Sequence, residues 1–102
     1  MEDKKIDILN DINQIISENF ETGDRKFYDI SLLDSEQLIS YNSFMNLVKS
    51  KTSEPYTHIF ISDNPVKRFV NIKNNDSEEV LYDSFSNEDK ITFDTFFNLF
   101  TL

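Results

Sequence analysis

The sequence predicts an α+β domain with an N-terminal helix, a strand, a second helix, a three-stranded antiparallel meander and a C-terminal helix. Three observations predict it. Apolar residues recur at helical intervals near both ends and in segment 34–50, alternate with polar residues in 26–32 and in parts of 56–85, and are separated by turn-forming residues. The 102 residues are the length of one domain, and we treat 1–102 as a single unit.

The first helix is predicted in the segment that precedes Gly23, the only glycine, which suits a helix C-terminus. Its apolar stripe, at intervals of three and four residues, consists of Ile8, Leu9, Ile12, Ile15, Ile16 and Phe20. The opposite face carries Asp7, Asp11, Gln14, Glu18 and Glu21. This acidic ridge is either an ordinary solvated face or a row of carboxylates for a basic partner.

A strand and a second helix follow. Residues Lys26 to Leu32 alternate in polarity and predict the strand. Residues Asp34 to Ser50 then carry apolar side chains at helical spacing, namely Leu38, Tyr41, Phe44, Met45 and Val48. We expect this helix to begin between Ser35 and Ser40.

The second half of the chain predicts a meander and a closing helix. Extended segments are expected at 56–61, 66–73 and 79–85, with turns at 62–65 and 74–77 that are rich in Ser, Asp, Asn and Pro. The closing helix carries Phe93, Phe96, Phe97 and Phe100 on one face.

An internal repeat relates the second and last helices. Segment 35–48 aligns without gaps to 87–100 at an offset of 52. The identical pairs are Glu36/Glu88, Ile39/Ile91, Phe44/Phe96, Asn46/Asn98 and Leu47/Leu99. We expect Ser40 and Thr92 to cap the two helices after a short extended pair. The repeat has two possible origins. One is duplication of half of the domain, which we favour, and the other is convergence of two helix starts on similar residues.

Composition excludes most catalytic and cofactor chemistry. The chain has no Cys, which removes disulfides, zinc–thiolate sites, iron–sulfur clusters and thiol catalysis. His58 is the only His, and we expect it to pack in a strand. A single glycine cannot build a phosphate-binding loop. The repeat resembles the exit half of an EF-hand calcium loop, but Asp89 replaces the turn glycine and Thr95 the bidentate glutamate. We therefore predict a protein that is not an enzyme, with no catalytic residue, cofactor or metal.

The net charge of −9 points to a basic partner. It disfavours direct binding of nucleic acid or of anionic membranes. The longest apolar runs are too short to span a bilayer and the start does not look like a secretory signal, so a cytoplasmic location is expected. The carboxylates predicted to meet the partner are Asp7, Asp11, Glu18, Glu21, Asp76, Glu78 and Glu79.

These features lead to three hypotheses. The first is an inhibitor that binds a basic, nucleic-acid-handling protein such as a nuclease, either as a nucleic-acid mimic or as an immunity-type protein. The absence of Ala and the abundance of residues with AT-rich codons suggest an AT-rich genome, such as that of a low-GC bacterium or its phage, where small counter-defence proteins occur. The second is an adaptor module or homodimer that uses an apolar patch. The third is a small ligand-binding domain.

Overall fold

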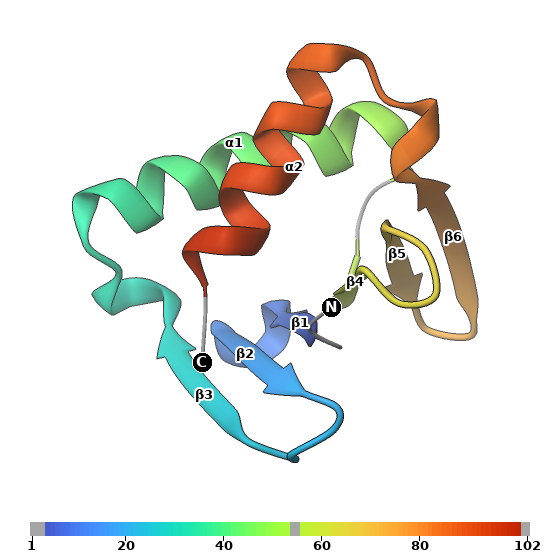
Figure 1. The fold of residues 1–102 in the computed structure, drawn as a ribbon. Helices are drawn as coiled ribbons and strands as arrows, with labels where there is room; N and C mark the ends of the chain where they lie inside the picture. The colour runs from blue at the N-terminus through green and yellow to red at the C-terminus, as the bar shows by residue number, and fades with distance from the viewer. Residues whose placement is uncertain (1–3, 54–55, 101–102) are drawn as a thin grey trace.

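The computed structural model describes residues 4–53 and 56–100, and its six strands form one antiparallel sheet in the order β3-β2-β1-β4-β5-β6. Two helices, α1 and α2, lie on the same face of this sheet and cross each other (Figure 1). The strands are β1 (Lys4–Leu9), β2 (Gln14–Asn19), β3 (Arg25–Asp29), β4 (His58–Ser62), β5 (Arg68–Lys73) and β6 (Asp76–Leu81). The helices are α1 (Ser35–Lys51) and α2 (Asn87–Leu99), and the short 3-10 turns are η1 (Asn10–Ile12), η2 (Ile30–Leu32) and η3 (Tyr82–Ser84).

The prediction of an N-terminal helix was wrong, because the first 16 residues that the structure describes form the β1–η1–β2 hairpin. Ile6, Ile8 and Ile15 are buried on one face of the sheet, which is the two-residue period of strands. Ile12, which a helix would have buried, is 59 % exposed in the turn. Asn13 adopts φ 52°, the left-handed conformation that Asn tolerates and that lets the chain reverse.

Gly23 also has a different role from the predicted one. It lies in the turn between β2 and β3 with φ +76°, a conformation that glycine adopts without steric cost. Its N–H donates to the Asn19 carbonyl at 2.8 Å. Gly23 therefore closes a hairpin and does not end a helix.

The element order is the same in the two halves of the chain: three strands, a 3-10 turn and a helix. η2 and η3 begin 52 residues apart, as do α1 and α2. The two halves meet where β1 pairs antiparallel with β4, so that Ile6 lies opposite Ile61 and Ile8 opposite Ile59. The fold is thus two βββα units arranged about a pseudo-two-fold axis.

Both helices lie where their aromatic stripes predicted them, but their caps differ from the prediction. The side chain of Asp34 accepts a hydrogen bond from Gln37 N at the start of α1, and Ser86 accepts one from Asp89 N at the start of α2. Ser40 and Thr92 lie inside the helices and cap neither of them. The two residues before Ser40 and before Thr92, which we expected to be extended, are helical. The reason is that the actual N-caps, Asp34 and Ser86, lie six residues earlier in the chain.

The predicted meander exists as β4, β5 and β6, but it is half of a larger sheet. β6 begins at Asp76, inside the expected turn, because Asn74 takes φ 54° and a two-residue loop suffices. β3 and β6 end earlier than predicted, since η2 and η3 follow them directly.

The core lies between the sheet and the two helices. Phenylalanine is the most frequent residue among the buried hydrophobic residues described, and Phe44, Phe69, Phe93, Phe96 and Phe100 are fully buried. Neither helix has the length and apolar character that crossing a bilayer requires.

Candidate functional site

The acidic residues predicted to meet a partner do not form one row. Asp7 and Glu18 lie on β1 and β2, whereas Asp11 lies in η1 and Glu21 in the turn after β2. The other three, Asp76, Glu78 and Glu79, belong to the edge strand β6. Because 7–21 is a hairpin, the helical ridge on which the prediction depended is absent.

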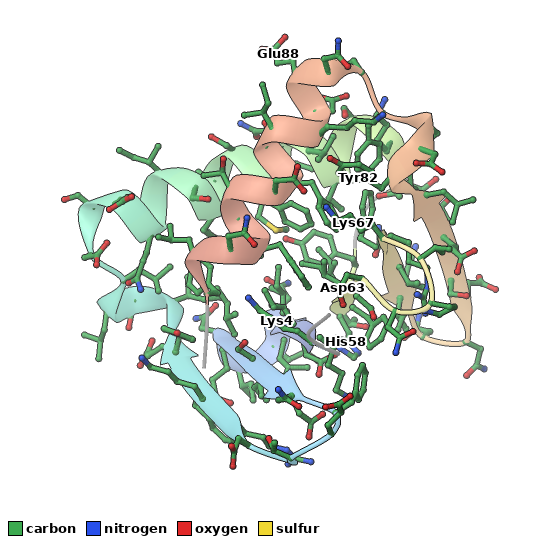
Figure 2. All side chains as sticks on the ribbon, viewed as in Figure 1. Lys4, His58, Asp63, Lys67, Tyr82 and Glu88 are labelled. Atoms are coloured by element: carbon green, nitrogen blue, oxygen red, sulfur yellow. The ribbon has the colours of Figure 1, made fainter. Side chains whose placement is uncertain are left out.

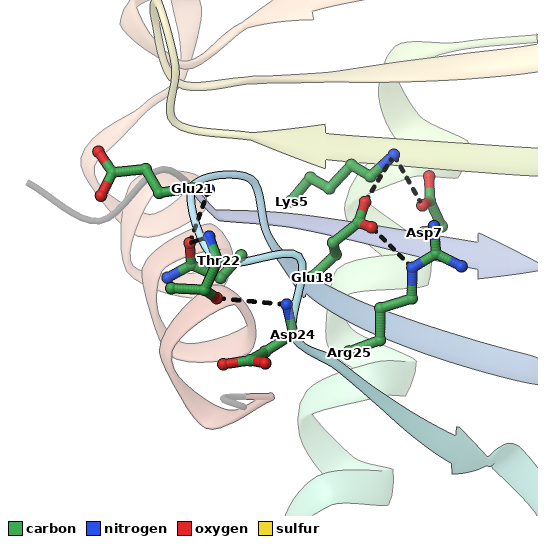
Figure 3. A network of polar contacts seen from close by, with 8 residues as sticks. Lys5, Asp7, Glu18, Glu21, Thr22, Asp24 and Arg25 are labelled. Carbon is green, nitrogen blue, oxygen red and sulfur yellow. Dashed lines mark hydrogen bonds and ion pairs between the residues drawn. The ribbon is translucent and has the colours of Figure 1, made fainter.

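The carboxylates of Asp7 and Glu18 form ion pairs with basic side chains on their own strand or on a neighbouring one (Figure 3). Lys5 Nζ lies 3.1 Å from Glu18 Oε1 and 3.7 Å from Asp7 Oδ2. Arg25 Nε lies 2.7 Å from Glu18 Oε2, and His58 Nε2 is 2.9 Å from Asp7 Oδ1. Hydrogen bonds from Arg25 and Lys5 hold the pKa of Glu18 below its ordinary value. Through these contacts the two carboxylates link neighbouring strands on the sheet face that the helices leave uncovered.

Two of the acids of β6 are also engaged. Glu79 Oε2 lies 3.1 Å from Arg68 Nε, and Glu78 accepts hydrogen bonds from the N–H and hydroxyl of Ser53. Asp76 and Glu78 line a hollow of about 360 Å³ together with Ser53, Asn71, Lys73 and Ser77. The charge in this hollow is mixed.

A second hollow, of about 260 Å³, lies between the two helices and has a different character. Its lining is mainly apolar or hydroxylic: α1 contributes Glu36, Ile39, Ser40 and Ser43, and α2 contributes Ile91, Thr92 and Thr95. We call these seven residues the helix groove. Ile39 is 67 % exposed and Ile91 66 % exposed, although isoleucine is among the residues most often buried in folded proteins.

The helix groove has the pseudo-two-fold symmetry of the fold. At the offset of 52, Ile39 corresponds to Ile91, Ser40 to Thr92 and Ser43 to Thr95. Glu88, the counterpart of Glu36, lies one turn before Ile91 and projects from the N-terminal end of α2 (Figure 2). The core accounts for repeated residues such as Phe44 and Phe96, but packing does not account for the pair of exposed isoleucines.

The polar groups around the helix groove include several without partners. In the part of the chain that the structure describes, neither Glu36 nor Glu88 forms an ion pair. Asp89, next to Glu88, is paired with Lys51 at 3.5 Å. The Ser40 hydroxyl is buried and has no hydrogen-bond partner among the described residues. The groove thus offers two apolar anchoring points and one unpaired carboxylate, Glu36, and a second unpaired carboxylate, Glu88, lies one turn before Ile91 on α2.

The sequence contained a signal for this site. Ile39 and Ile91 are identical in the repeat but lie outside the aromatic stripes of their helices. A repeated apolar residue on the polar face of an amphipathic helix indicates a surface contact. Interpreting the repeat as helix capping overlooks this signal.

No protein-family model, curated protein or solved structure matches this chain. Within residues 4–53 and 56–100, no three acidic or histidine side chains come together in a way that could hold a metal ion.

Proposed function

We propose that this protein is a non-enzymatic binding module that takes a basic amphipathic helix of a partner protein into the helix groove. The observation that carries the proposal is the pair of exposed isoleucines, Ile39 and Ile91, in a groove that also contains Glu36. Glu88 lies one turn before Ile91 on α2. An amphipathic helix recognises such a groove by inserting a few apolar side chains, and lysines or arginines beside them would meet the two carboxylates.

Charge supports a basic partner over a second copy of the chain in this groove. The whole molecule has a net charge of −9, which attracts a cationic segment from a distance. This attraction increases the rate at which the two associate. A second copy would bring its own Glu36 and Glu88 toward the first pair. Like charges at an interface are unfavourable, so self-association through this face is disfavoured.

The partner predicted from composition, a basic nucleic-acid-handling protein such as a nuclease, is compatible with this site. Inhibition would follow if the bound helix belongs to the working surface of that enzyme. Mimicry of a nucleic acid has lost its main support, because Asp7 and Glu18 are paired with bases and do not form a helical row.

The test uses a synthetic amphipathic peptide with leucines on one face and lysines on the other, titrated with the protein and followed by fluorescence anisotropy. Ile39→Asn and Ile91→Asn remove the anchors, and Glu36→Gln with Glu88→Gln removes the carboxylates. All four side chains are exposed, so the fold should be unaffected. Leu32→Asn, at an exposed leucine outside the groove, and Asp11→Asn, at an exposed acid in η1, are matched controls.

Each isoleucine variant should weaken peptide binding on the order of tenfold, the loss expected when the burial of one large aliphatic side chain is removed. The glutamate variants should weaken it less and reduce its dependence on salt. The controls should bind as the wild type does. Equal losses for Asp11→Asn and Glu36→Gln, or binding that ignores both isoleucine substitutions, would exclude the helix groove as the site.

A further inference from the structure

Among the residues that the structure describes, β3 and β6 are the two unpaired edges of the sheet, and the hydrogen-bond pattern shows which residues of β3 face outward. Ile30 N donates to Asn13 O at 2.9 Å and Asn19 N to Asp24 O at 3.0 Å, so the bonded pairs of β2 and β3 fall at every second residue between them. Arg25, Phe27 and Asp29 therefore direct their N–H and C=O groups away from β2. These groups are available to another strand.

The side chains of the same three residues are exposed and lie on the sheet face that the helices leave uncovered. Phe27 is 57 % exposed at the middle of the strand. Arg25 stands two residues before it and Asp29 two residues after it. The edge is therefore self-complementary: turned through 180° about Phe27, it places the Asp29 carboxylate of one copy opposite the Arg25 guanidinium of the other, whose Nε also binds Glu18 within its own copy.

We infer that a second copy of this chain adds to the sheet at β3, in antiparallel orientation and centred on Phe27. Phe27 of each copy lies opposite Phe27 of the other, and Arg25 of each lies opposite Asp29 of the other. In an antiparallel ladder these three opposing pairs each exchange two backbone hydrogen bonds. Cross-strand aromatic and opposite-charge pairs add stability to such a ladder.

The local charge agrees with this assignment. β3 carries Arg25, Lys26 and Asp29, so it is a weakly cationic edge on a molecule with a net charge of −9. A contact made by one short strand from each copy is small, so we expect a dimer that forms at high protein concentration.

The other edge does not offer the same contact. Tyr82 N donates to Lys67 O at 3.0 Å, which turns the N–H and C=O of Ser77, Glu79 and Leu81 outward from β6. Symmetric pairing of two β6 strands about their middle would place Glu79 opposite Glu79. Like charges directly opposite each other destabilise a strand pair.

Head-to-tail pairing of β3 with β6 of the next copy is also less favourable. It places Phe27 opposite a polar side chain, Ser77 or Glu79, or else opposite Leu81 with Asp29 facing Glu79. Such pairing would in addition build an open-ended chain of molecules, whereas β3 with β3 closes as a dimer.

The chain has no cysteine, so a single introduced cysteine reports the contact directly. Phe27→Cys should form a disulfide-linked dimer under mild oxidation, since opposing residues of a bonded pair lie about 5.5 Å apart between Cα atoms, within disulfide range. Leu81→Cys on β6 is the matched control, because Leu81 is likewise an exposed edge residue on the same sheet face.

Phe27→Cys should cross-link on the order of tenfold faster than Leu81→Cys, because pairing raises the effective thiol concentration. Sedimentation of the wild type should show dimers at high concentration, and Phe27→Lys should remove them by placing two ammonium groups face to face. Equal cross-linking rates for the two cysteine variants would overturn the proposal. So would a mixture of the two variants in which Phe27→Cys couples preferentially to Leu81→Cys, since that product reports head-to-tail pairing.

Discussion

Phe44 and Phe96 stack with ring centroids 4.6 Å apart and planes 10° apart, and they are the same position of the repeat. The pseudo-two-fold axis therefore passes through the crossing of α1 and α2. The neighbouring contacts follow this symmetry: Tyr41 lies 6.5 Å from Phe96, and its counterpart Phe93 lies 6.2 Å from Phe44. One aromatic pair joins the two halves above the sheet, and the β1–β4 ladder joins them within it.

Because the two rings contact each other, the double substitution should lower the free energy of unfolding by less than the sum of the two single substitutions. We expect Phe44→Leu and Phe96→Leu each to lower the free energy of unfolding by about 1 to 2 kcal/mol. The double variant should recover a coupling energy of about 0.5 to 1.5 kcal/mol in urea titrations. Phe85→Leu and Phe100→Leu, whose rings share no partner, provide the comparison cycle. Additive costs for Phe44 and Phe96 would contradict the stacking.

The helices could be predicted from the sequence because their aromatic residues fit only one period. Phe93, Phe96, Phe97 and Phe100 are spaced as one helix face and are all buried or nearly so. The N-terminal segment fits two periods, since Ile8, Ile12, Ile15 and Ile16 match a helix while Ile6, Ile8 and Ile15 match a hairpin with a turn at 10–13. The presence of a turn at 10–13 distinguishes the hairpin from the helix, and the turn-forming residues Asn10 and Asn13 were the local sequence feature that indicated it.

The site could be predicted only in part. The repeat identified Ile39 and Ile91 as equivalent, but their approach depends on how α1 crosses α2, which no local pattern gives. The sequence also contained no sign that Asp7 and Glu18 have basic partners. These partners, Lys5, Arg25 and His58, come from three different strands, β1, β3 and β4. Charge compensation in a sheet is set by register.

Glu18 should contribute to the acid sensitivity of the fold. Its pKa is lowered in the folded protein by Arg25 and Lys5, so its stabilising contribution is present above the ordinary value of 4.5 and is lost as the pH falls through the lowered folded value. Glu18→Gln should lower stability at neutral pH and flatten the fall in stability on acidification. Unfolding free energies measured from pH 7 to about pH 3 test this. An unchanged slope in Glu18→Gln would contradict this contribution of Glu18.

Tyr82 should titrate late. Its hydroxyl donates to Asp94 Oδ2 at 2.7 Å, and this hydrogen bond raises the pKa of Tyr82 above 10.0. Asp94→Asn should bring this pKa back toward 10.0 in an ultraviolet titration, with Tyr82→Phe identifying the signal. Asp83→Asn, which removes a nearby charge without breaking a hydrogen bond, should have a smaller effect.

The same hydrogen bond has a consequence for stability in alkali. A raised pKa in the folded state means that the contribution of protonated Tyr82 is complete below 10.0 and is lost as the pH rises through the folded value. Wild type should therefore lose more stability than Tyr82→Phe across this range. An identical alkaline slope for the two proteins would show that Tyr82 is not coupled to folding.

The middle residues of β2 and β5 each hold the C-terminal end of the helix from the other half. Ser17 Oγ donates to Phe100 O at 2.9 Å, where α2 ends, and Asn71 Nδ2 donates to Thr52 Oγ1 at 2.7 Å and Ser53 O at 3.2 Å, where α1 ends. Both side chains are buried, so removing either leaves a carbonyl or hydroxyl without its donor.

Ser17→Ala should therefore lower the free energy of unfolding by about 1 kcal/mol, and Asn71→Ala by more, because it breaks two hydrogen bonds and opens a larger gap. Ser31→Ala, whose hydroxyl donates to Asp29 on the surface, is the control and should cost less than about 0.5 kcal/mol. Amide exchange should locate the effects in opposite helices: the last turn of α2 should open more often in Ser17→Ala and the last turn of α1 in Asn71→Ala. In this arrangement, the three strands of each half stabilise the helix of the other half. Faster amide exchange in the helix of the same half as the substitution would contradict it.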